Sequence, residues 1–365
     1  MAWSPGQDAA LKAVADWLKR PDPQVFRMFG YAGTGKTTLA KQIAEDVEGE
    51  VAFGAYTGKA ALVLRSKGCR GASTIHSMIY RPRADDEESG MPSFALNRQG
   101  AAADADLIIV DECSMVDEEL GRDLLSFGKP VLVLGDSAQL PPIKGGGFFN
   151  DAEPDVMLTE VHRQAADNPI IRLSMQVREG GRLSVGHYGE SRVVRRSDIG
   201  AAAVMQADQV LVGINKTRRA YNGRMRELLG HSGEEPSVGE RLVCLRNDKK
   251  KGLLNGGTFT VSRVHGTRGA RLILSVRPDD EPDRKAVRVG VRPEFFTGRE
   301  EELPLAVRRD SDQFDFGYAL TVHKAQGSQW DEVMLFDESF AFREHRDRWL
   351  YTGLTRAAAR ITVVL

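Results

Sequence analysis

The stretch GYAGTGKTT, residues 30–38, lies between the apolar run VFRMF (25–29) and the helix-like segment LAKQIAEDV (39–47). It matches the pattern G-x-x-x-x-G-K-[ST], whose glycines let the backbone curl so that N–H groups point at phosphate oxygens. The pattern requires a strand before the loop and a helix after it, because the positive helix N-terminus also faces the phosphates. A simple glycine-rich turn would not need that context. The stretch therefore predicts a nucleotide site in an α/β fold.

Side chains of the loop have separate predicted roles. Lys36 is placed to reach the β- and γ-phosphates, and the Thr37 hydroxyl is placed to complete a Mg²⁺ shell. We therefore expect ATP and Mg²⁺ as the bound groups. The loop alone does not say which kind of nucleotide hydrolase this is. The predicted nucleotide contacts in the loop are Gly33, Thr34, Gly35, Lys36, Thr37 and Thr38.

The composition of the chain limits the number of domains and the classes of protein to which it can belong. The chain has 365 residues and a net charge of −1, so we expect two or three domains and no overall basic excess. Near-neutral charge argues little against a polyanionic partner, because acidic surface elsewhere can offset a basic groove. Cys69, Cys113 and Cys244 lie far apart, which disfavours a zinc site or a disulfide framework. No stretch approaches membrane-spanning length, so we expect no membrane partner and a cytoplasmic protein, bacterial or phage-encoded.

Short apolar runs alternate with helical patterns through about the first 150 residues. This alternation is typical of a parallel sheet wrapped by helices. Each run ends in a polar or glycine-rich turn, and ligands of such sheets collect at the carboxyl ends of the strands. We therefore expect the four turns to share one rim. The predicted strands are VFRMF (25–29), VAFGAY (51–56), DLIIV (106–110) and PVLVLG (130–135).

Two regions depart from this pattern. Residues 80–100 are polar and lack an apolar period, which predicts either a small hairpin, with Phe94 at its tip or base, or a disordered linker. A second α/β pattern begins near residue 155. It is interrupted over 236–311 by short, evenly spaced β-like runs with Gly, Asp and Pro turns, and it resumes over 312–365. The interruption predicts a small barrel inserted into the second α/β domain.

The run LIIVDECSMVD ends in a pair of carboxylates. Nucleotide hydrolases with this loop need one carboxylate to hold the Mg²⁺ shell, and Asp111 is placed for that role. They also need a base for the attacking water, and Glu112 is the candidate. An ordinary acidic strand end is the alternative for a lone Asp-Glu pair, but here the pair follows an apolar strand in a chain already expected to bind nucleotide. Cys113 is interpreted as a small core residue.

Three further side chains are candidates for contact with the γ-phosphate. Gln139 follows another strand, and its uncharged amide suits phosphate sensing without titration. Arg163 and Arg356 stand in the second α/β pattern, which begins near residue 155, and each alone would be interpreted as surface charge. Across a cleft from a phosphate loop, however, an arginine neutralises charge that develops on the transferred phosphoryl group.

Taken in order, nine segments of the chain resemble superfamily 1 helicases, and more narrowly the RecD-like branch of superfamily 1B DNA helicases. The resemblance runs from about residue 4 to residue 362, and the order of the segments is more specific than any one of them. The segments are SPGQ, GYAGTGKTT, AYTGKAA, STIHSMIY, VDECSMVD, VLGDSAQLPPI, LTEVHRQ, YALTVHKAQGSQWDEV and YTGLTRAAAR.

This resemblance implies an α/β fold with two RecA-like P-loop domains, ATP in the cleft between them and single-stranded DNA across their top. It implies 5′-to-3′ movement powered by Mg-ATP hydrolysis, with separation of duplex as the output. It also implies a small β-hairpin insertion in the first domain and an SH3-like β-barrel insertion in the second. The implied boundaries are 1–79 and 101–152 for domain 1A, 80–100 for the 1B pin, 153–235 and 312–365 for domain 2A, and 236–311 for the 2B insertion.

Matching positions imply roles for single residues. Gln7 would contact adenine, Gly327 would contact ATP, and Arg163 and Arg356 would be the two arginine fingers. Phe94 would lie in the pin that splits duplex. The residues that would grip the DNA strand carry hydroxyl, imidazole or ammonium donors suited to phosphate. They are Thr57, Lys59, Thr74, His76, Thr321, His323 and Lys324.

The chain departs from the family pattern at two places. Gln329 stands where many relatives have Glu, which puts a ribose or DNA contact in doubt. The pin segment is short and acidic at DDEE. Junctions of single- and double-stranded DNA are the implied partners, together with a single-strand-binding, replication or repair protein, and the chain is expected to be a monomer.

Two other classes of function remain open from the residues. One is a non-motor P-loop enzyme, such as a small-molecule kinase, whose turnover DNA would not affect. The other is a nucleic-acid remodeller that uses ATP as a binding switch. RNA is also open as the track, because phosphate contacts distinguish the two nucleic acids poorly and contacts to the 2′-hydroxyl are what would separate them.

Overall fold

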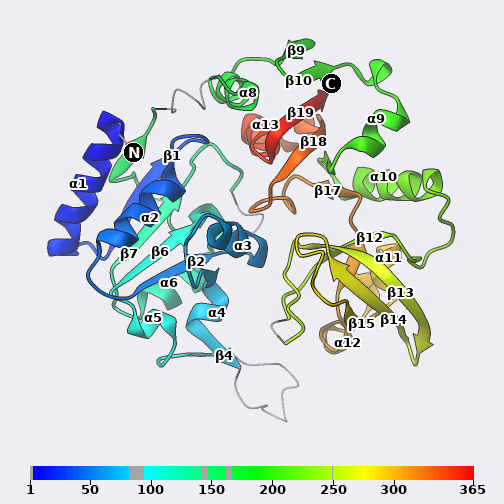
Figure 1. Ribbon diagram of the computed structural model, residues 1–365, viewed down its shortest axis with the longest axis horizontal. Coiled ribbons are helices and arrows are strands. Elements are labelled where there is room, and N and C mark those ends of the chain that lie inside the picture. Colours follow the sequence, from blue (N-terminus) through cyan, green and yellow to red (C-terminus); the bar gives the residue numbers. More distant parts are fainter. Residues whose placement is uncertain (1–2, 83–93, 142–146, 151, 161–166, 249) are drawn as a thin grey trace.

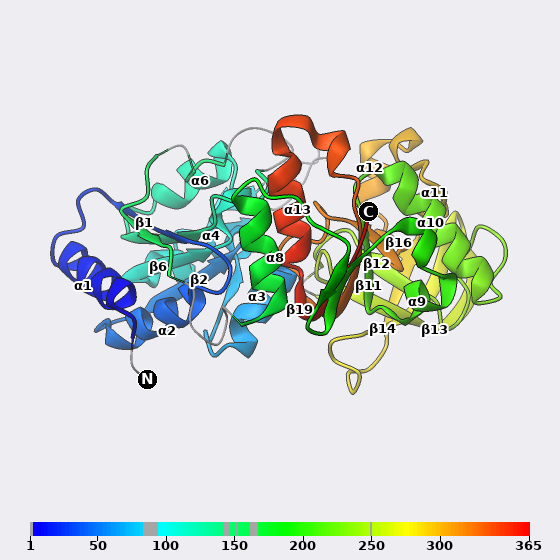
Figure 2. The same cartoon turned by 90° about the horizontal axis from the view of Figure 1, so that it is seen from above.

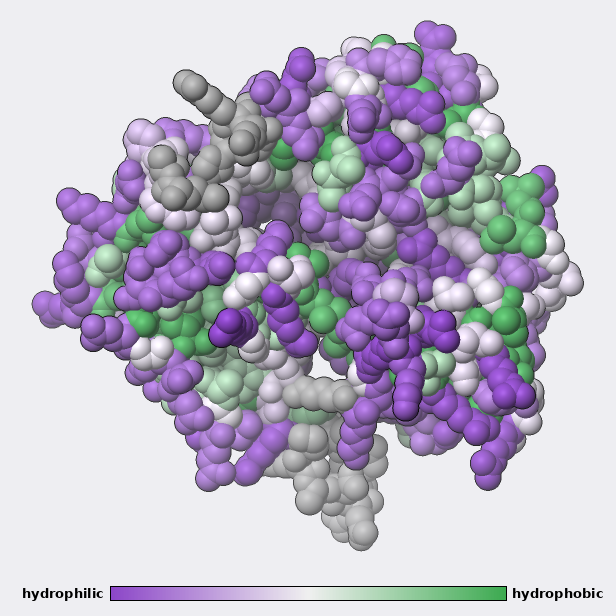
Figure 3. Space-filling view, viewed as in Figure 1, coloured by the Kyte–Doolittle hydropathy of each residue, from purple (hydrophilic) through white to green (hydrophobic). Residues whose placement is uncertain are grey.

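The computed structural model describes residues 3–82, 94–141, 147–150, 152–160, 167–248 and 250–365. Figures 1 and 2 show two α/β units side by side, with a smaller, mostly β unit next to the second. Across the described part of the chain, no helix is long and apolar enough to cross a membrane. Figure 3 shows a face where hydrophilic side chains predominate and hydrophobic ones form small groups.

The first unit is built on a six-stranded parallel sheet in the order β3-β2-β6-β7-β1-β8. Its central strands are apolar on both faces because helices cover both sides. The four strands predicted from the sequence are all present. The strands are β1 (Val25–Gly30), β2 (Val51–Ala55), β3 (Ser73–Thr74), β6 (Leu107–Asp111), β7 (Val131–Gly135) and β8 (Val156–Leu158).

Alternate residues of each central strand enter two different cores. On β6, Leu107 and Ile109 pack with α1, α2 and α3, whereas Ile108 and Val110 pack with α4, α5 and α6. Ser4 caps α1 in a reciprocal capping box, which fixes where that helix begins. The helices are α1 (Pro5–Lys19), α2 (Lys36–Asp46), α3 (Gly58–Ser66), α4 (Ile75–Ile79), α5 (Ala101–Asp104) and α6 (Glu118–Leu125).

The boundary expected after residue 152 is wrong. Strand β8 (Val156–Leu158) falls within the range expected for the second α/β domain, yet it pairs in parallel with β1 at the edge of the first sheet. The run looks like the start of a new pattern because its partner strand lies far back in the sequence. Alternation of strand and helix predicts that a strand exists, but not which sheet it joins.

The second α/β unit has a six-stranded sheet in the order β17-β11-β18-β19-β10-β9, parallel except for the β9–β10 pair. Its strands are β9 (Gly186–Tyr188), β10 (Ser191–Val194), β11 (Gln209–Val212), β17 (Ala319–Thr321), β18 (Trp330–Phe336) and β19 (Ala357–Val364). One face packs on α8 and α13, and the other on α10 and the small β unit. The helices are α8 (Pro169–Arg178), α9 (Ala201–Gln206), α10 (Asn215–Leu228) and α13 (Arg346–Leu354).

The small unit is a five-stranded antiparallel sheet in the order β15-β14-β13-β12-β16. A bridge between Val291 and Asp312 brings its two edges together, so the sheet curls towards closure. The strands are β12 (Arg241–Cys244), β13 (Thr258–Arg268), β14 (Arg271–Pro278), β15 (Val287–Val291) and β16 (Phe314–Phe316), with the short helices α11 (Glu294–Thr297) and α12 (Leu305–Arg309).

The boundary expected at residue 312 also moves. Strand β16 pairs with β12, so residues 314–316 belong to the small sheet rather than to the second α/β unit. Two buried ion pairs join this sheet to α10: Arg226 binds Glu240 through two hydrogen bonds of 2.6 and 3.0 Å, and Arg218 binds Asp315 at 2.6 Å. Breaking one partner of such a pair leaves an uncompensated buried charge, so the two units are firmly connected.

Within residues 80–100, the described ends form a two-stranded antiparallel pair of β4 (Tyr80–Pro82) and β5 (Phe94–Leu96). Phe94 pairs with Pro82 and is 61% exposed. The acidic DDEE stretch lies outside the described residues. Of the two alternatives for this region, the described ends therefore match the hairpin.

Candidate functional site

The loop between β1 and α2 has the backbone that its glycines predict. Gly33 and Gly35 have φ values of +81° and +83°, in the left-handed region that favours glycine. Thr34 is buried, and its hydroxyl donates to the Tyr31 carbonyl oxygen at 2.8 Å, which closes the curl from inside. The loop therefore turns tightly and leads into the N-terminus of α2.

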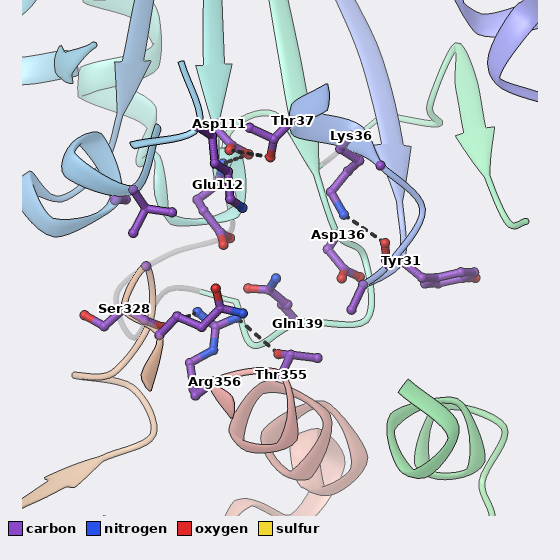
Figure 4. Close-up of a pocket in the computed structure, with 18 of the residues that line it drawn as sticks. Tyr31, Lys36, Thr37, Asp111, Glu112, Asp136, Gln139, Ser328, Thr355 and Arg356 are labelled. Carbon is purple, nitrogen blue, oxygen red and sulfur yellow. Dashed lines mark hydrogen bonds between the residues drawn. The ribbon is translucent and has the colours of Figure 1, made fainter. Parts of the chain in front are cut away.

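Lys36, the first residue of α2, extends over this loop. Its ammonium donates to the carbonyl oxygens of Gly30 at 2.5 Å and Tyr31 at 3.1 Å. Figure 4 shows Lys36 and Thr37 on one side of a cleft that Arg356 faces from the other side. The cation is thus held at the loop, on the side that opens to the cleft.

The cleft has a volume of about 360 Å³ and takes its walls from both α/β units. The first unit contributes the loop, the end of β6 and the turn after β7, and the second contributes the segments before β18 and after α13. Ten of the predicted residues line it: Gly33, Gly35, Lys36, Thr37, Thr38, Asp111, Glu112, Gln139, Gly327 and Arg356.

Thr37 and Asp111 meet at the phosphate-loop side of the cleft. The Thr37 hydroxyl lies 3.4 Å from Oδ2 of Asp111. A hydroxyl and one carboxylate fit Mg²⁺, which binds oxygen and keeps several of its waters beside substrate phosphates. Within the described ranges, no cluster of three or more His, Cys, Asp or Glu side chains is arranged to hold a metal ion. The Thr37 hydroxyl and the Asp111 carboxylate together fit an ion that also binds nucleotide phosphates and water.

Glu112 adopts an unusual backbone conformation. Its φ of 54° lies in the left-handed region, which non-glycine residues rarely adopt. Its N–H donates to Oδ1 of Asp111 at 2.9 Å. Burial raises the pKa of Glu112, and the nearby Arg356 opposes this shift. Strained backbone is found at functional sites, where the surrounding structure holds the residue in place. The adjacent Cys113 is fully buried, as expected for a core residue.

Gln139 and Arg356 face each other across the cleft (Figure 4). Gln139 is 8% exposed, and its amide oxygen has no hydrogen-bond partner among the described residues. Arg356 is buried, and its guanidinium donates to the carbonyl oxygens of Thr352 at 3.1 Å and Ser328 at 3.3 Å. A buried, unpaired amide oxygen beside a guanidinium is suited to a polar ligand. Arg163 lies outside the described residues.

Gln7 lies behind the phosphate loop. It is buried, its Nε2 donates to the Thr34 carbonyl oxygen at 3.1 Å, and its Oε1 accepts from the Ser4 N–H at 3.0 Å. It is not among the residues that line the cleft. In this conformation Gln7 ties α1 to the loop, and its contact with adenine stays a prediction. The S-x-x-Q spacing is itself the signal for the cap.

Some cleft residues were missed in the sequence. Asp136 and Thr355 stand inside motifs already quoted, so their neighbours were a usable signal. Gln329 was singled out as a departure, and it lines the cleft. Two further cleft residues have no feature in the sequence that marks them. Tyr31 stands at an unspecified position of the loop pattern, and Lys67 follows the last residue of α3. The ring of Tyr31 lies under the guanidinium of Arg178, 3.8 Å from it.

The three threonines predicted to contact DNA share one local geometry. Each stands at or just after the end of a strand and accepts a backbone N–H three residues later. Thr57 accepts from Ala60 at 3.1 Å, Thr74 from Ser77 at 3.2 Å, and Thr321 from Lys324 at 3.3 Å. The threonines therefore cap the turns that follow the strands.

The cations and imidazoles of this set have different surroundings. Lys324 is exposed and His323 is half-buried, and burial lowers the pKa of His323. Lys59 is buried and forms an ion pair with Asp280, on the loop between β14 and β15 of the small unit. The small unit thus reaches α3 in the first unit. A side chain at Gly58 would meet Leu254 of the small unit at 2.6 Å, which shows how closely the two pack.

His76 belongs to a row of rings that leads to Phe94. Ring centroids are 6.5 Å apart for Tyr56 and His76, 5.7 Å for His76 and Tyr80, and 6.2 Å for Tyr80 and Phe94. The Tyr80 hydroxyl donates to Asp123 at 2.6 Å, which fixes its orientation. The row connects the strand end at Tyr56 with the hairpin, and no pattern of the sequence indicates it.

Comparison with known proteins agrees with this geometry. A family model described as AAA domain matches residues 2–198, and one described as UvrD-like helicase C-terminal domain matches residues 316–364. The chain is 32% identical over 361 residues to the ATP-dependent RecD2 DNA helicase of Deinococcus radiodurans, which covers 91% of this chain and 45% of that protein. It is 24% identical over 401 residues to the RecBCD enzyme subunit RecD of Mycobacterium tuberculosis, covering 92% of this chain and 65% of that one.

The chain therefore spans less than two thirds of either relative. Among solved structures, it resembles Bacteroides Pif1 bound to single-stranded DNA with a TM-score of 0.59 at 17% identity, over 99% of this chain and 92% of that one. This likeness supports the two-domain RecA-like fold. Because the AAA domain model covers more than half of the chain, the chain belongs to the AAA domain family. It is similar to the RecD-like helicases over nine tenths of its length.

Proposed function

We propose that this protein is an ATP-dependent 5′-to-3′ DNA helicase that moves along single-stranded DNA and separates duplex. The observation that carries the proposal is the cleft of about 360 Å³ in which the phosphate loop and Gln139 face Arg356 of the other α/β unit. A nucleotide bound there would contact both units at once. Hydrolysis would remove that bridge, so ATP turnover would open and close the cleft.

In this proposal, each side chain of the cleft has one task. Lys36 binds the β- and γ-phosphates, and Thr37 and Asp111 hold Mg²⁺, which when bound neutralises phosphate charge. Glu112 accepts a proton from the attacking water, and burial raises the pKa of its carboxylate, which makes it a stronger base. Arg356 stabilises the charge that develops on the transferred phosphoryl group.

Three assignments rest on the family resemblance together with position. Arg163 is proposed as the second arginine finger. Gln7 is proposed to contact adenine, which requires it to exchange one of its present hydrogen bonds for the base. Gln139 is proposed to sense the γ-phosphate, and its unpaired amide oxygen and cleft position support this role.

The proposed DNA path crosses the strand ends that carry Thr57, Thr74 and Thr321. A threonine hydroxyl has two acceptor sites and one proton, so a capping oxygen that accepts a backbone N–H can still donate to a phosphate. His323 and Lys324 lie at the last of these turns. Contacts of this kind hold the backbone without reading sequence, as a translocating protein needs.

Two features surround this path. We assign the small sheet to the SH3-like 2B insertion. Its Asp280 carboxylate forms an ion pair with the ammonium of Lys59, so a DNA phosphate must compete with Asp280 for Lys59. The β4–β5 hairpin corresponds to the 1B pin. Its exposed Phe94 ends the ring row that begins at Tyr56, and aromatic rings stack with unpaired bases whatever their sequence.

Strand displacement on partial duplexes tests the proposal. Substrates carry either a 5′ or a 3′ single-stranded tail, and ATP turnover is followed in parallel with and without DNA. Opening of the 5′-tailed substrate alone is expected. Opening of the 3′-tailed substrate alone would keep the motor but reverse the direction, and DNA-independent turnover without opening would favour a non-motor P-loop enzyme.

A further inference from the structure

The hydroxyl of Tyr351 connects three parts of the molecule. Tyr351 lies on α13 of the second unit, and its Oη donates to Oδ2 of Asp136 at 2.7 Å, on the turn after β7. The same oxygen accepts the N–H of Ala32, in the phosphate loop, at 2.8 Å. Tyr351 is 1% exposed and Asp136 is 3% exposed, so the bond between them is shielded from water. Ala32 is half-buried, at the wall of the cleft.

A second set of bonds holds the turn that carries Gln139. The N–H of Leu140 donates to Oγ1 of Thr352 at 2.9 Å, and Nε2 of Gln326 donates to the Leu140 carbonyl oxygen at 3.0 Å. Both partners belong to the second unit. The turn is therefore held through its backbone on one side of Gln139 and through Asp136 on the other.

The same helix positions the guanidinium across the cleft. The carbonyl oxygen of Thr352 accepts from Nε of Arg356 at 3.1 Å, and the hydroxyl of Thr355 accepts from its Nη2 at 3.1 Å. Tyr351 and Thr352 dock on the first unit while Thr352 and Thr355 orient Arg356. A shift of α13 relative to the phosphate loop must therefore move the guanidinium, Gln139 or both.

Burial raises the pKa of Tyr351, and the neighbouring Asp136 carboxylate raises it further. The hydroxyl therefore keeps its proton and remains a donor throughout the working pH range. A buried carboxylate that loses its donor retains the full cost of desolvation. The bridge favours the docked arrangement of the two units over one in which they separate.

We infer that Tyr351 is a positioning residue for ATP hydrolysis, which couples the phosphate loop and the Gln139 turn to the helix that orients Arg356. This inference rests on the proposed function, because it concerns the same cleft. Tyr351 does not line the cleft itself, so it acts through Asp136 and Ala32 rather than by touching nucleotide. Its hydroxyl determines the fraction of molecules in which the phosphate loop, Gln139 and Arg356 are all in position for hydrolysis.

The variant Tyr351→Phe tests this, since it keeps the ring and removes the hydroxyl. We expect kcat for ATP hydrolysis to fall roughly ten- to hundredfold, the range for a lost hydrogen bond to a buried charged group. The Kd for ADP should change less than about threefold, because the phosphate contacts of the first unit remain. Tyr188→Phe is the matched control, since the Tyr188 hydroxyl donates at 2.8 Å to Ser184 on the exposed edge of the second unit. An unchanged kcat in Tyr351→Phe would overturn the inference.

Hydrogen exchange supplies a readout that does not depend on activity. In Tyr351→Phe, peptides that contain Ala32 or Leu140 should exchange faster than in the parent protein, and in Tyr188→Phe they should not. Equal exchange rates of these peptides in all three proteins would show that the Tyr351 hydroxyl does not position the phosphate loop or the Gln139 turn. If the parent protein fails to hydrolyse ATP, the proposed function fails, while the exchange comparison still decides whether Tyr351 docks the units.

A second variant covers the case in which Tyr351→Phe folds poorly. Both carboxylate oxygens of Asp136 accept a hydrogen bond, Oδ1 from the Ala138 N–H and Oδ2 from the Tyr351 hydroxyl. Asp136→Asn leaves a single acceptor oxygen, so it should weaken the same bridge and lower kcat as Tyr351→Phe does. In the double variant the two losses should be less than additive, because both act through one bond. Full additivity would show that the two residues act independently, against the inference.

Discussion

The proposed ATP cleft and the proposed DNA-facing surface, which carries Thr57, Lys59, Thr74, Thr321, His323 and Lys324, use their side chains differently. In the cleft, Lys36, Glu112 and Arg356 converge on one volume from three elements of two units. On the DNA-facing surface, the predicted residues already make bonds within the protein: Thr57 caps α3, and Lys59 pairs with Asp280. One region is assembled around a single ligand, whereas the other is spread over the ends of several strands.

The difference follows from the ligands. A nucleotide is compact, so a group 1 Å out of place loses much of its effect on the reaction. A DNA strand is long and is bound through many weak, repeated phosphate contacts, so each contact can be shared with a structural role. We therefore expect large effects from single changes in the cleft and small ones on the DNA-facing surface.

The largest effect is expected from Lys36→Ala. Removing the ammonium that binds the β- and γ-phosphates should abolish measurable ATP turnover while the thermal midpoint of unfolding stays close to that of the parent. Lys41→Ala is the matched control, because Lys41 is an exposed lysine on the same helix, 3.7 Å from Glu45. Retained turnover in Lys36→Ala would contradict the role of the loop.

Arg356→Ala should slow hydrolysis on the order of a thousandfold and spare nucleotide binding, because an arginine finger acts on the transition state. ATP turnover and ADP affinity are the two measurements. Arg360→Ala is the control, because Arg360 is an exposed arginine on β19 that pairs with Glu332 on β18. Because Arg356 is buried, Arg356→Lys is measured too, and it should hydrolyse slowly while folding normally. Parent-like turnover in both Arg356 variants would remove this residue from the mechanism.

The pH profile of hydrolysis sharpens the comparison at Glu112. Burial disfavours the carboxylate, so its pKa is raised and the base is lost as the pH falls through that value. The acidic limb of kcat/KM, which reports the groups of the free enzyme, should therefore lie above the ordinary range of a glutamate side chain. Glu112→Gln should have little activity and lack this limb. An unchanged limb in Glu112→Gln would assign it to another group.

The smallest effect is expected at the DNA-facing surface. Asp280→Asn frees the ammonium of Lys59 from its carboxylate, so the Kd for single-stranded DNA should fall roughly two- to fivefold, as the strength of a partly exposed ion pair allows. Glu281→Gln changes a neighbouring carboxylate and is the control. Weaker DNA binding in Asp280→Asn would show that Asp280 supports the path rather than competing for it.

Much of the fold was predictable because it is local. Short continuous apolar runs predicted four of the six strands of the first sheet, and the positive φ of Gly33 and Gly35 follows from the loop pattern. The errors concern pairing over long sequence distances. Strand β8 (156–158) joins β1, and β16 (314–316) joins β12, so both boundaries shifted by a few residues.

The candidate site divides in the same way. The residue types at Lys36, Thr37 and Asp111 are required by phosphate and Mg²⁺ chemistry, so the motif alone identifies them. The roles of Tyr351 and Asp280 depend on which surfaces of two units meet, and neither residue is unusual in its own stretch of sequence.

The sequence by itself determined the phosphate loop, the strand pattern and the order of the motifs, because backbone conformation and ligand chemistry act through neighbouring residues. Only the tertiary structure decided which sheet each short strand joins, that Gln7 ties α1 to the loop, and that one tyrosine hydroxyl bridges two units across the cleft. Those outcomes depend on burial and hydrogen bonding between residues far apart in the chain. Such contacts form only when the whole chain has folded.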